Sequence, residues 1–418
     1  MILHPVLRVL FAELDDADIS WCVLRGEAQL DGTSRDVDLL VARSQIPQLA
    51  TVLDRLHFGR IRALGHGAHS FFVTYHAATD KWIKLDVVTE IMFGPYQTVE
   101  TDAASGILMR RERREGISLL APSDGFWCLL LHCMLDKGSI DPRHRDQLEQ
   151  LVVAAREMNP TGMGILPAAL SGRLRADDLL TRVECGAWRE LEQIGPAWRR
   201  EWERRQRHAT RRHAANRTLR IVGDVVRVAT RPGFAVALLA PDGAGKTTLA
   251  RALTRSFHPT FSTRYVYMGF GQSHRSSLNY SIPGVSMLIT IVRYFAGFVH
   301  LALGRIVIFD RYAYDAFLPS LRRRNVRERT HSWFLSHVHP TPDTVLILDA
   351  PADVLYARKP EHALEELERH RQEYLDLASK LPEPVIVDAS RDPEEVRREA
   401  LAEIWRLYAR RLSPRARS

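Results

Sequence analysis

The segment Phe234–Leu253 constrains the fold of this 418-residue chain more than any other. It begins with the run Phe234–Ala240, whose apolar composition is typical of a buried β-strand. A glycine turn and a predicted helix start follow, and that helix opens with Lys246, Thr247 and Thr248. This order matches the pattern G-x-x-x-x-G-K-[ST], except that Ala240 stands at the first glycine position.

The glycine turn predicts a phosphate-binding site. In such a turn the backbone N–H groups converge on phosphates, and the helix N-terminus adds partial positive charge. We expect Lys246 to reach the β- and γ-phosphates of ATP and the Thr247 hydroxyl to bind Mg²⁺. The expected nucleotide-binding residues here are Asp242, Gly243, Ala244, Gly245, Lys246, Thr247 and Thr248. The alternative is an ordinary glycine turn before a helix.

Five short apolar runs predict an α/β fold for the carboxyl-terminal half. They are separated by helical or loop segments, a pattern typical of a parallel sheet with helices on both faces. Their continuous apolar character fits strands that are covered on both sides. The runs are Phe234–Ala240, Arg264–Met268, Arg305–Phe309, Thr344–Leu348 and Pro384–Val387. Ligands of such sheets bind at the carboxyl ends of the strands.

Charged residues follow two of these runs. Asp310 ends the run RIVIF and could hold Mg²⁺, while Arg311 could clamp a phosphoryl oxygen; the alternative is a surface salt bridge. Further on, basic residues flank the turn Pro360–His362 and could close over the phosphates. The candidates are Arg358, Arg369 and Arg371, and the alternative is a helix with internal charge pairs.

Taken together, these motifs resemble the thymidylate kinase family of P-loop nucleoside monophosphate kinases. The resemblance covers about Phe234 to Leu412 and rests on APDGAGKTT, VIFDRY, LILDAP, ARKPEHALEELERHRQEYL and VIVDAS. It implies Mg²⁺-dependent transfer of the ATP γ-phosphoryl group, with Asp310 and Arg311 between donor and acceptor. It also implies basic lid residues over the phosphates, Ala389 and Ser390 near the adenine, and pairing of two copies through helices.

Two departures concern the phosphoryl acceptor. Family members that act on thymidylate carry a TREPG segment, and the matching segment Tyr267–Gly271 reads YMGFG. The residues after DRY, AYDAFLPS, also differ from the family pattern. We therefore expect an unidentified small-molecule acceptor; the alternatives are a genuine thymidylate kinase and an ATP-binding regulatory protein.

The amino-terminal part has its own candidate site. A strand-like run, Ile19–Gly26, is followed by Asp36 and Asp38, which would lie on one side of a strand and could bind a divalent metal ion. Asp86 ends the strand-like KWIKL and could complete the cluster. The alternative is an exposed acidic strand edge.

This stretch resembles the minimal nucleotidyltransferase superfamily. The match covers roughly Asp18 to Val88 and rests on LRG, DVDLLV and KLDVV. It implies that Asp36 and Asp38 bind metal and that Asp86 is the third ligand or the base. Gly26 is followed by Glu27, where the superfamily usually has serine or glycine.

These patterns predict three regions. Residues 1–116 would form the α+β nucleotidyltransferase-like core, 117–220 a helical region, and 221–418 the P-loop domain. The helical region contains the apolar run after Ser123 and Asp124, which we expect to cap a helix.

Composition limits the partners. The net charge of +8 comes mainly from Trp198–Arg220 and Arg410–Arg417, and such runs are usually solvated helix faces or ends, so nucleic acid is not the expected partner. The four cysteines are scattered, which fits a reducing cytoplasm. The apolar stretch Pro283–Gly304 contains Arg293 and His300 and predicts a buried helix in preference to a membrane span.

Overall fold

The computed structural model describes residues 2–25, 30–32, 36–159, 162, 164–166, 175–206, 209–258, 260–268, 285–319, 341–381 and 383–412. The chain forms two compact units. The N-terminal unit contains Met1–Thr74 and Lys81–Val226, and the C-terminal unit contains Tyr75–Asp80 and Arg227–Ser418.

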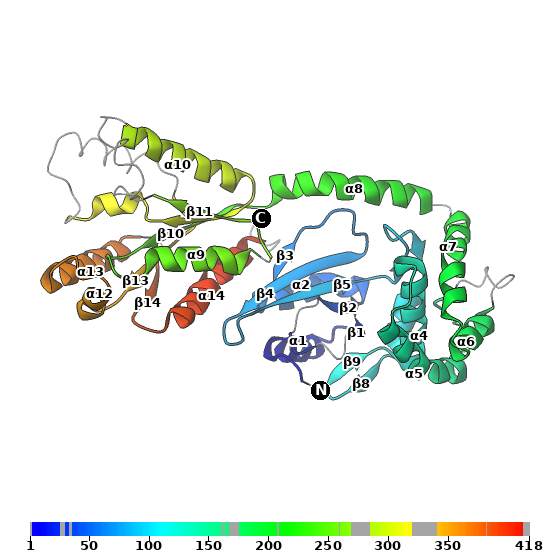
Figure 1. Ribbon diagram of the computed structural model, residues 1–418. Coiled ribbons are helices and arrows are strands. Elements are labelled where there is room, and N and C mark those ends of the chain that lie inside the picture. Colours follow the sequence, from blue (N-terminus) through cyan, green and yellow to red (C-terminus); the bar gives the residue numbers. More distant parts are fainter. Residues whose placement is uncertain are drawn as a thin grey trace. The chain divides into compact units, whose positions relative to one another are not determined.

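The C-terminal unit is built on a five-stranded parallel sheet (Figure 1). Its strand order is β11-β12-β10-β13-β14, so the first strand in the sequence lies at the centre. The strands are β10 (Phe234–Leu239), β11 (Thr263–Tyr267), β12 (Ile306–Asp310), β13 (Thr344–Asp349) and β14 (Val385–Asp388). The predicted parallel sheet is confirmed, and each strand boundary lies within one residue of its expected position.

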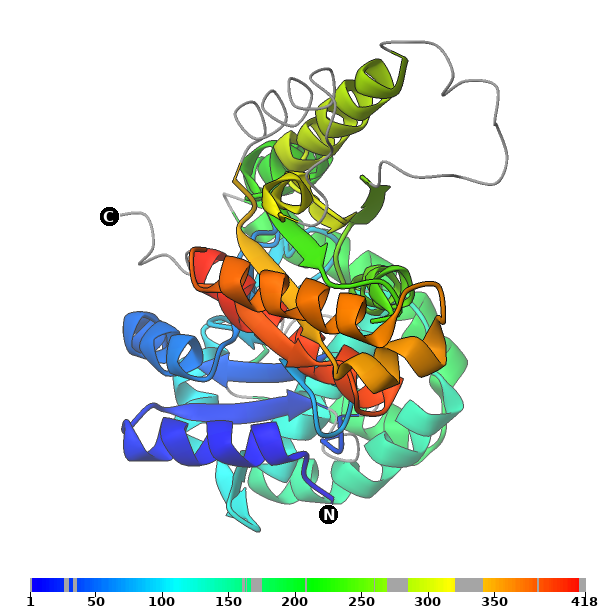
Figure 2. The ribbon, with the colours of Figure 1, turned by 90° about the vertical axis from the view of Figure 1, so that its left-hand side faces the viewer.

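Helices cover both faces of this sheet (Figure 2). On one face, α9 (Lys246–Phe257) and α14 (Pro393–Leu412) pack on the sheet, and Phe234 lies 5.1 Å from Tyr408 of α14 between ring centroids. On the other face lie α10 (Val285–Ala302) and α13 (Leu364–Ala378), while α12 (Ala352–Arg358) packs against α13. Burial on both faces explains why the strands read as continuous apolar runs.

The stretch predicted to be a buried helix forms α10, and between Val292 and Ala302, the part whose burial the structure describes, one face of α10 packs on the sheet. Gly297 packs so closely on the Phe309 ring that a Cβ atom there would lie 2.7 Å from it. The opposite side exposes Val292, Phe295 and Phe298, so this part of the predicted buried helix is only partly buried. No helix in the described parts of the chain is long and apolar enough to cross a membrane.

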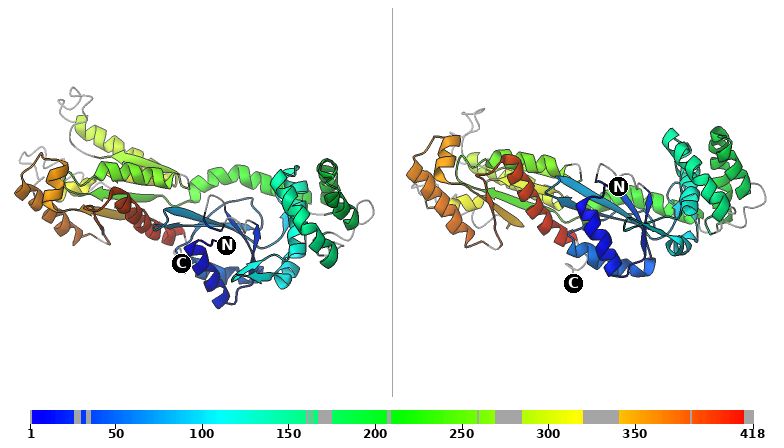
Figure 3. Two further views of the ribbon diagram at one scale, coloured as in Figure 1. Left: turned by 60° about the horizontal axis from the view of Figure 1, so that its bottom comes forward. Right: turned by 90° about the horizontal axis from the view of Figure 1, so that it is seen from below.

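The N-terminal unit contains a mixed seven-stranded sheet of order β3-β4-β5-β2-β1-β9-β8. Figure 3 shows this unit, coloured blue to green, from two further directions. Strands β1 and β2 are antiparallel, whereas β2 and β5 are parallel. The strands are β1 (Trp21–Arg25), β2 (Val37–Val41), β3 (Gly59–Ile61), β4 (His69–His76), β5 (Lys81–Val88), β8 (Glu112–Arg114) and β9 (Ile117–Leu119). A separate small ladder pairs β6 (Met92–Phe93) with β7 (Val99–Glu100).

Two hydrophobic cores lie on opposite faces of this sheet. One joins the sheet to α1 (Pro5–Asp16) and α2 (Ile46–Arg55). The other joins it to helices from the middle of the chain, so these helices belong to the same unit as the sheet. They are α3 (Ala103–Arg110), α4 (Pro122–Leu131), α5 (Pro142–Met158), α6 (Ala176–Glu184) and α7 (Trp188–Arg205), and α8 (Ala209–Thr230) follows them.

The expected cap of α4 is not formed by Ser123 and Asp124. The helix begins at Pro122, and neither residue precedes it. Asp124 is instead fully buried in the first turn, where the Arg110 guanidinium donates two hydrogen bonds to its carboxylate, at 2.9 and 3.0 Å. The acid therefore ties α3 to α4.

Candidate functional site

The glycine turn lies at the carboxyl end of β10 and leads directly into α9. Gly243 and Gly245 both have φ of 87°, a left-handed conformation that favours glycine. A Cβ atom at Gly243 would lie 2.7 Å from the carbonyl oxygen of Leu355 in α12, so a larger residue would also clash. Gly245 is the N-cap of α9, which leaves the first N–H groups of the helix facing the turn.

Lys246 is held inside this turn. Its side chain is only 6% exposed, and Nζ donates hydrogen bonds to the carbonyl oxygens of Ala240 at 2.6 Å and Pro241 at 2.8 Å. The carboxylate Oδ1 of Asp242 lies 3.6 Å from Nζ. Burial disfavours the charged ammonium and lowers the pKa of Lys246 to about 8, and the nearby Arg311 acts in the same direction.

Asp310 of β12 is hydrogen-bonded to residues of α9 and β11. It is fully buried at the end of β12, and its Oδ2 accepts hydrogen bonds from the Thr247 hydroxyl at 2.6 Å and the Tyr265 hydroxyl at 2.9 Å. Its other oxygen, Oδ1, is buried and has no hydrogen-bond partner within the described residues. A buried carboxylate oxygen without a donor, next to a threonine hydroxyl, suits a hard cation such as Mg²⁺.

Arg311 forms ion pairs with Asp242 of the glycine turn and with the buried Asp315. Its Nη2 lies 2.7 Å from Asp242 Oδ1, and its Nη1 lies 3.7 Å from Asp315 Oδ2. Its backbone has φ of 71°, which costs a residue other than glycine about 1–3 kcal/mol. Burial alone would raise the pKa of Asp242, but the nearby cations Lys246, Arg311 and Lys359 outweigh burial and lower it.

Asp315 connects Arg311 to α13. It is 5% exposed, and its Oδ1 accepts a hydrogen bond from the Tyr374 hydroxyl at 3.0 Å. Burial raises the pKa of Asp315, although Arg311 opposes that effect. The turn, β12 and α13 are thus linked through paired side chains.

The predicted lid arginines have different surroundings. Arg371 forms two bonds to Asp349 at the end of β13, at 2.6 and 3.0 Å, and a further bond to Glu368. Arg358 donates to the carbonyl oxygen of Ala389 at 2.8 Å, which places it beside the loop that contains Ser390. Arg369 is exposed on α13.

Sequence reasoning missed Tyr265, Asp315 and Tyr374. Tyr265 could have been found from strand alternation, because it pairs in register with Ile308 and so shares the side of the sheet on which Asp310 lies. The pairing of Asp315 with Tyr374 joins residues 59 positions apart and has no local signal.

In the N-terminal unit, two of the three predicted metal ligands lie next to each other. Asp38 of β2 and Asp86 of β5 are a register pair. However, Arg25 Nη2 lies 2.9 Å from Asp38 Oδ2, and His69 Nδ1 donates to both carboxylate oxygens of Asp86 at 2.7 and 2.9 Å.

The structure corrects where Asp36 and Asp86 lie along their strands. Asp36 is exposed and lies directly before the first residue of β2, where its charge acts on Asp38. Asp86 lies inside β5 and does not end it. Within the described ranges, no group of three or more His, Cys, Asp or Glu side chains is arranged to hold a metal ion. Arg25 and His69 thus contact carboxylate oxygens of Asp38 and Asp86 that the resemblance assigns to a metal ion.

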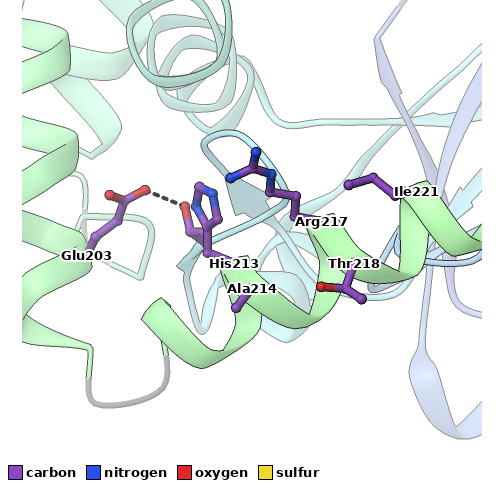
Figure 4. A pocket seen from close by; sticks show the side chains of 7 residues that line it. Glu203, His213, Ala214, Arg217, Thr218 and Ile221 are labelled. Atoms are coloured by element: carbon purple, nitrogen blue, oxygen red, sulfur yellow. Dashed lines mark hydrogen bonds between the residues drawn. The ribbon is translucent and has the colours of Figure 1, made fainter.

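A cavity of about 610 Å³ lies elsewhere in the N-terminal unit (Figure 4). Its wall includes side chains of both charges, and Glu203 accepts a hydrogen bond from Thr98 at 2.5 Å. None of the predicted site residues lines it. The lining residues are Thr98, Glu203, His213, Ala214, Arg217, Thr218 and Ile221.

No protein-family model and no curated protein matches this chain.

Proposed function

We propose that the C-terminal unit is an ATP- and Mg²⁺-dependent phosphotransferase of the thymidylate kinase-like class that acts on a small-molecule acceptor. The main support for this proposal is the hydrogen bond between the Thr247 hydroxyl and Asp310 Oδ2. The other carboxylate oxygen of Asp310 is buried and has no hydrogen-bond partner within the described residues. The helix N-terminus and Lys246 stand at the same end of the sheet, where α/β proteins bind ligands. The motif resemblance from APDGAGKTT to VIVDAS supports the same assignment.

Thr247 and Asp310 are the residues that would hold Mg²⁺. Both offer oxygen ligands, as Mg²⁺ requires. When bound, the ion would neutralise charge on the β- and γ-phosphate oxygens.

The other residues of the turn would bind and orient the triphosphate. The N–H groups at the start of α9 would donate to phosphate oxygens, and Lys246 would exchange its two carbonyl partners for the terminal phosphates. Arg311 would replace its bond to Asp242 with a paired bond to a phosphoryl oxygen, while Asp315 would continue to face it from within the protein.

The acceptor is proposed to differ from thymidylate. Tyr267 and Met268 stand where the family has the start of TREPG, and Gly269–Gly271 lie outside the described residues. The Arg293 guanidinium lies 5.9 Å from the centre of the Tyr267 ring, so one cation is available near the end of β11.

Acceptor-dependent ADP release tests this function. The purified chain would be incubated with ATP, Mg²⁺ and pools of small metabolites, and products would be read by mass spectrometry. Lys246→Ala should remove the release, whereas Lys380→Ala, a change of an exposed lysine in the same unit, should preserve it. A wild-type rate that no acceptor raises would contradict the proposal.

A second candidate is a nucleotide-responsive regulatory protein, in which the rearrangement of Lys246 and Arg311 on nucleotide binding would be the signal. Lys246 and Arg311 are occupied by groups of the protein itself, so nucleotide binding would rearrange the turn. This candidate predicts slow ATP hydrolysis that does not depend on any acceptor.

A further inference from the structure

Four charged or ionisable side chains form a row across the N-terminal sheet. The strands β4, β5, β2 and β1 are consecutive neighbours, and they carry His69, Asp86, Asp38 and Arg25 respectively. Arg25 is the register partner of Asp38, and Asp38 is the register partner of Asp86. The two carboxylates therefore occupy the middle of the row, with a basic side chain at each end.

Without Arg25 and His69, the carboxylates of Asp38 and Asp86 would repel each other, because they lie on neighbouring strands. Neighbouring strands lie about 4.8 Å apart, and like charges directly opposite each other are destabilising. Here each carboxylate turns to its own outer neighbour: Asp38 to Arg25 at 2.9 Å and Asp86 to His69 at 2.7 Å. Burial raises the pKa of Asp38, and Arg25 counteracts that effect more strongly than any other neighbour.

The four side chains of the row are partly exposed, so a cation in solution could approach the two carboxylates. The side chains of Asp38 and Asp86 are 18% and 14% exposed, and those of Arg25 and His69 are 38% and 20% exposed. A small cation could reach the carboxylates only where Arg25 and His69 do not already cover their oxygens.

We infer that Arg25 and His69 take the place of a divalent cation at Asp38 and Asp86. The two carboxylates should therefore bind a divalent cation when both basic side chains are removed. With Arg25 and His69 in place, Asp38 and Asp86 would not bind the metal ion that nucleotidyl transfer requires. The inference does not depend on the function proposed for the C-terminal unit.

Binding of Mn²⁺ to the full chain, without nucleotide, tests the inference. Free Mn²⁺ would be followed by electron paramagnetic resonance for the wild type and for the double variant Arg25→Ala/His69→Ala. The matched control is Arg43→Ala/His76→Ala, which removes an arginine paired with the single acid Glu90 and a histidine bonded to Thr79. Any Mn²⁺ held at the phosphate-binding turn is common to all variants, because its residues are unchanged.

The double variant should gain one Mn²⁺ site that is at least tenfold tighter than anything in the wild type or the control. Adding Asp38→Asn to the double variant should abolish the gain. If the double variant is shown by circular dichroism to be misfolded, Arg25→Gln alone, which keeps a polar side chain, should give a weaker gain of the same kind. A folded variant without added binding would overturn the inference, as would a wild-type site that Asp38→Asn removes.

Discussion

The buried ammonium of Lys246 should make the stability of the C-terminal unit depend on pH. Its pKa is lowered from the ordinary value of 10.5 to about 8, mainly because burial disfavours the charged form. At about 1.4 kcal/mol per pKa unit, this difference corresponds to about 3 kcal/mol. Because only 6% of the residue is exposed, solvent screening reduces the figure little.

The sign follows from the protons bound in each state. Below pH 8 Lys246 is charged in both the folded and the unfolded chain, and the folded state carries the full cost of burying that charge. Between pH 8 and 10.5 the folded chain releases the proton while the unfolded chain keeps it, so the cost disappears as pH rises. The methionine side chain of Lys246→Met does not titrate, so in this variant position 246 contributes no pH dependence to stability.

We therefore expect the free energy of unfolding of the wild type to rise, relative to Lys246→Met, by up to about 3 kcal/mol between pH 8 and 10.5. For a unit of this size that is roughly 6–12 °C in Tm. Calorimetry at several pH values measures it, and Ile404→Ala, which truncates a fully buried side chain of α14, identifies the transition of the C-terminal unit. Lys380→Met is the control and should show no such trend. A difference between wild type and Lys246→Met that stays constant with pH would refute the reasoning.

Three further predictions concern activity. Asp310→Asn should lower Mg²⁺-dependent turnover roughly a hundredfold, about 2.7 kcal/mol of barrier, in steady-state kinetics; an unchanged rate would remove Asp310 from the site. Asp36→Asn combined with Asp38→Asn should leave ATP turnover unaltered, and a loss would show that the two sites are not independent. Thymidylate should support little turnover, so efficient formation of thymidine diphosphate, detected by mass spectrometry, would overturn the interpretation of Tyr267–Gly271.

The sheet of the C-terminal unit could be predicted from the sequence because both of its faces are buried. Runs such as Phe234–Ala240 and Thr344–Leu348 contain few polar residues, so strand position is marked locally. The same local logic predicts the helix α10 but does not locate its buried face. An apolar helix such as α10 can leave Phe295 exposed, because hydropathy does not say which face meets the sheet.

Side-chain partners from distant segments could not be predicted in this way. The sequence predicts Lys246, Thr247 and Asp310 as site residues, whereas the hydrogen bond between Tyr374 and Asp315 joins segments 59 positions apart and is known only from the structure. The row from Arg25 to His69 depends on the register of four strands, which no local pattern specifies.

The central claim is that the C-terminal unit moves a phosphoryl group from ATP to another molecule. The most direct measurement follows ATP labelled with ¹⁸O in its γ-phosphoryl group, incubated with Mg²⁺, a metabolite mixture and the wild-type chain or Lys246→Ala. We expect a metabolite that gains the labelled phosphoryl mass with the wild type and not with the variant. Label that appears only in inorganic phosphate, at a rate indifferent to every metabolite, would contradict it.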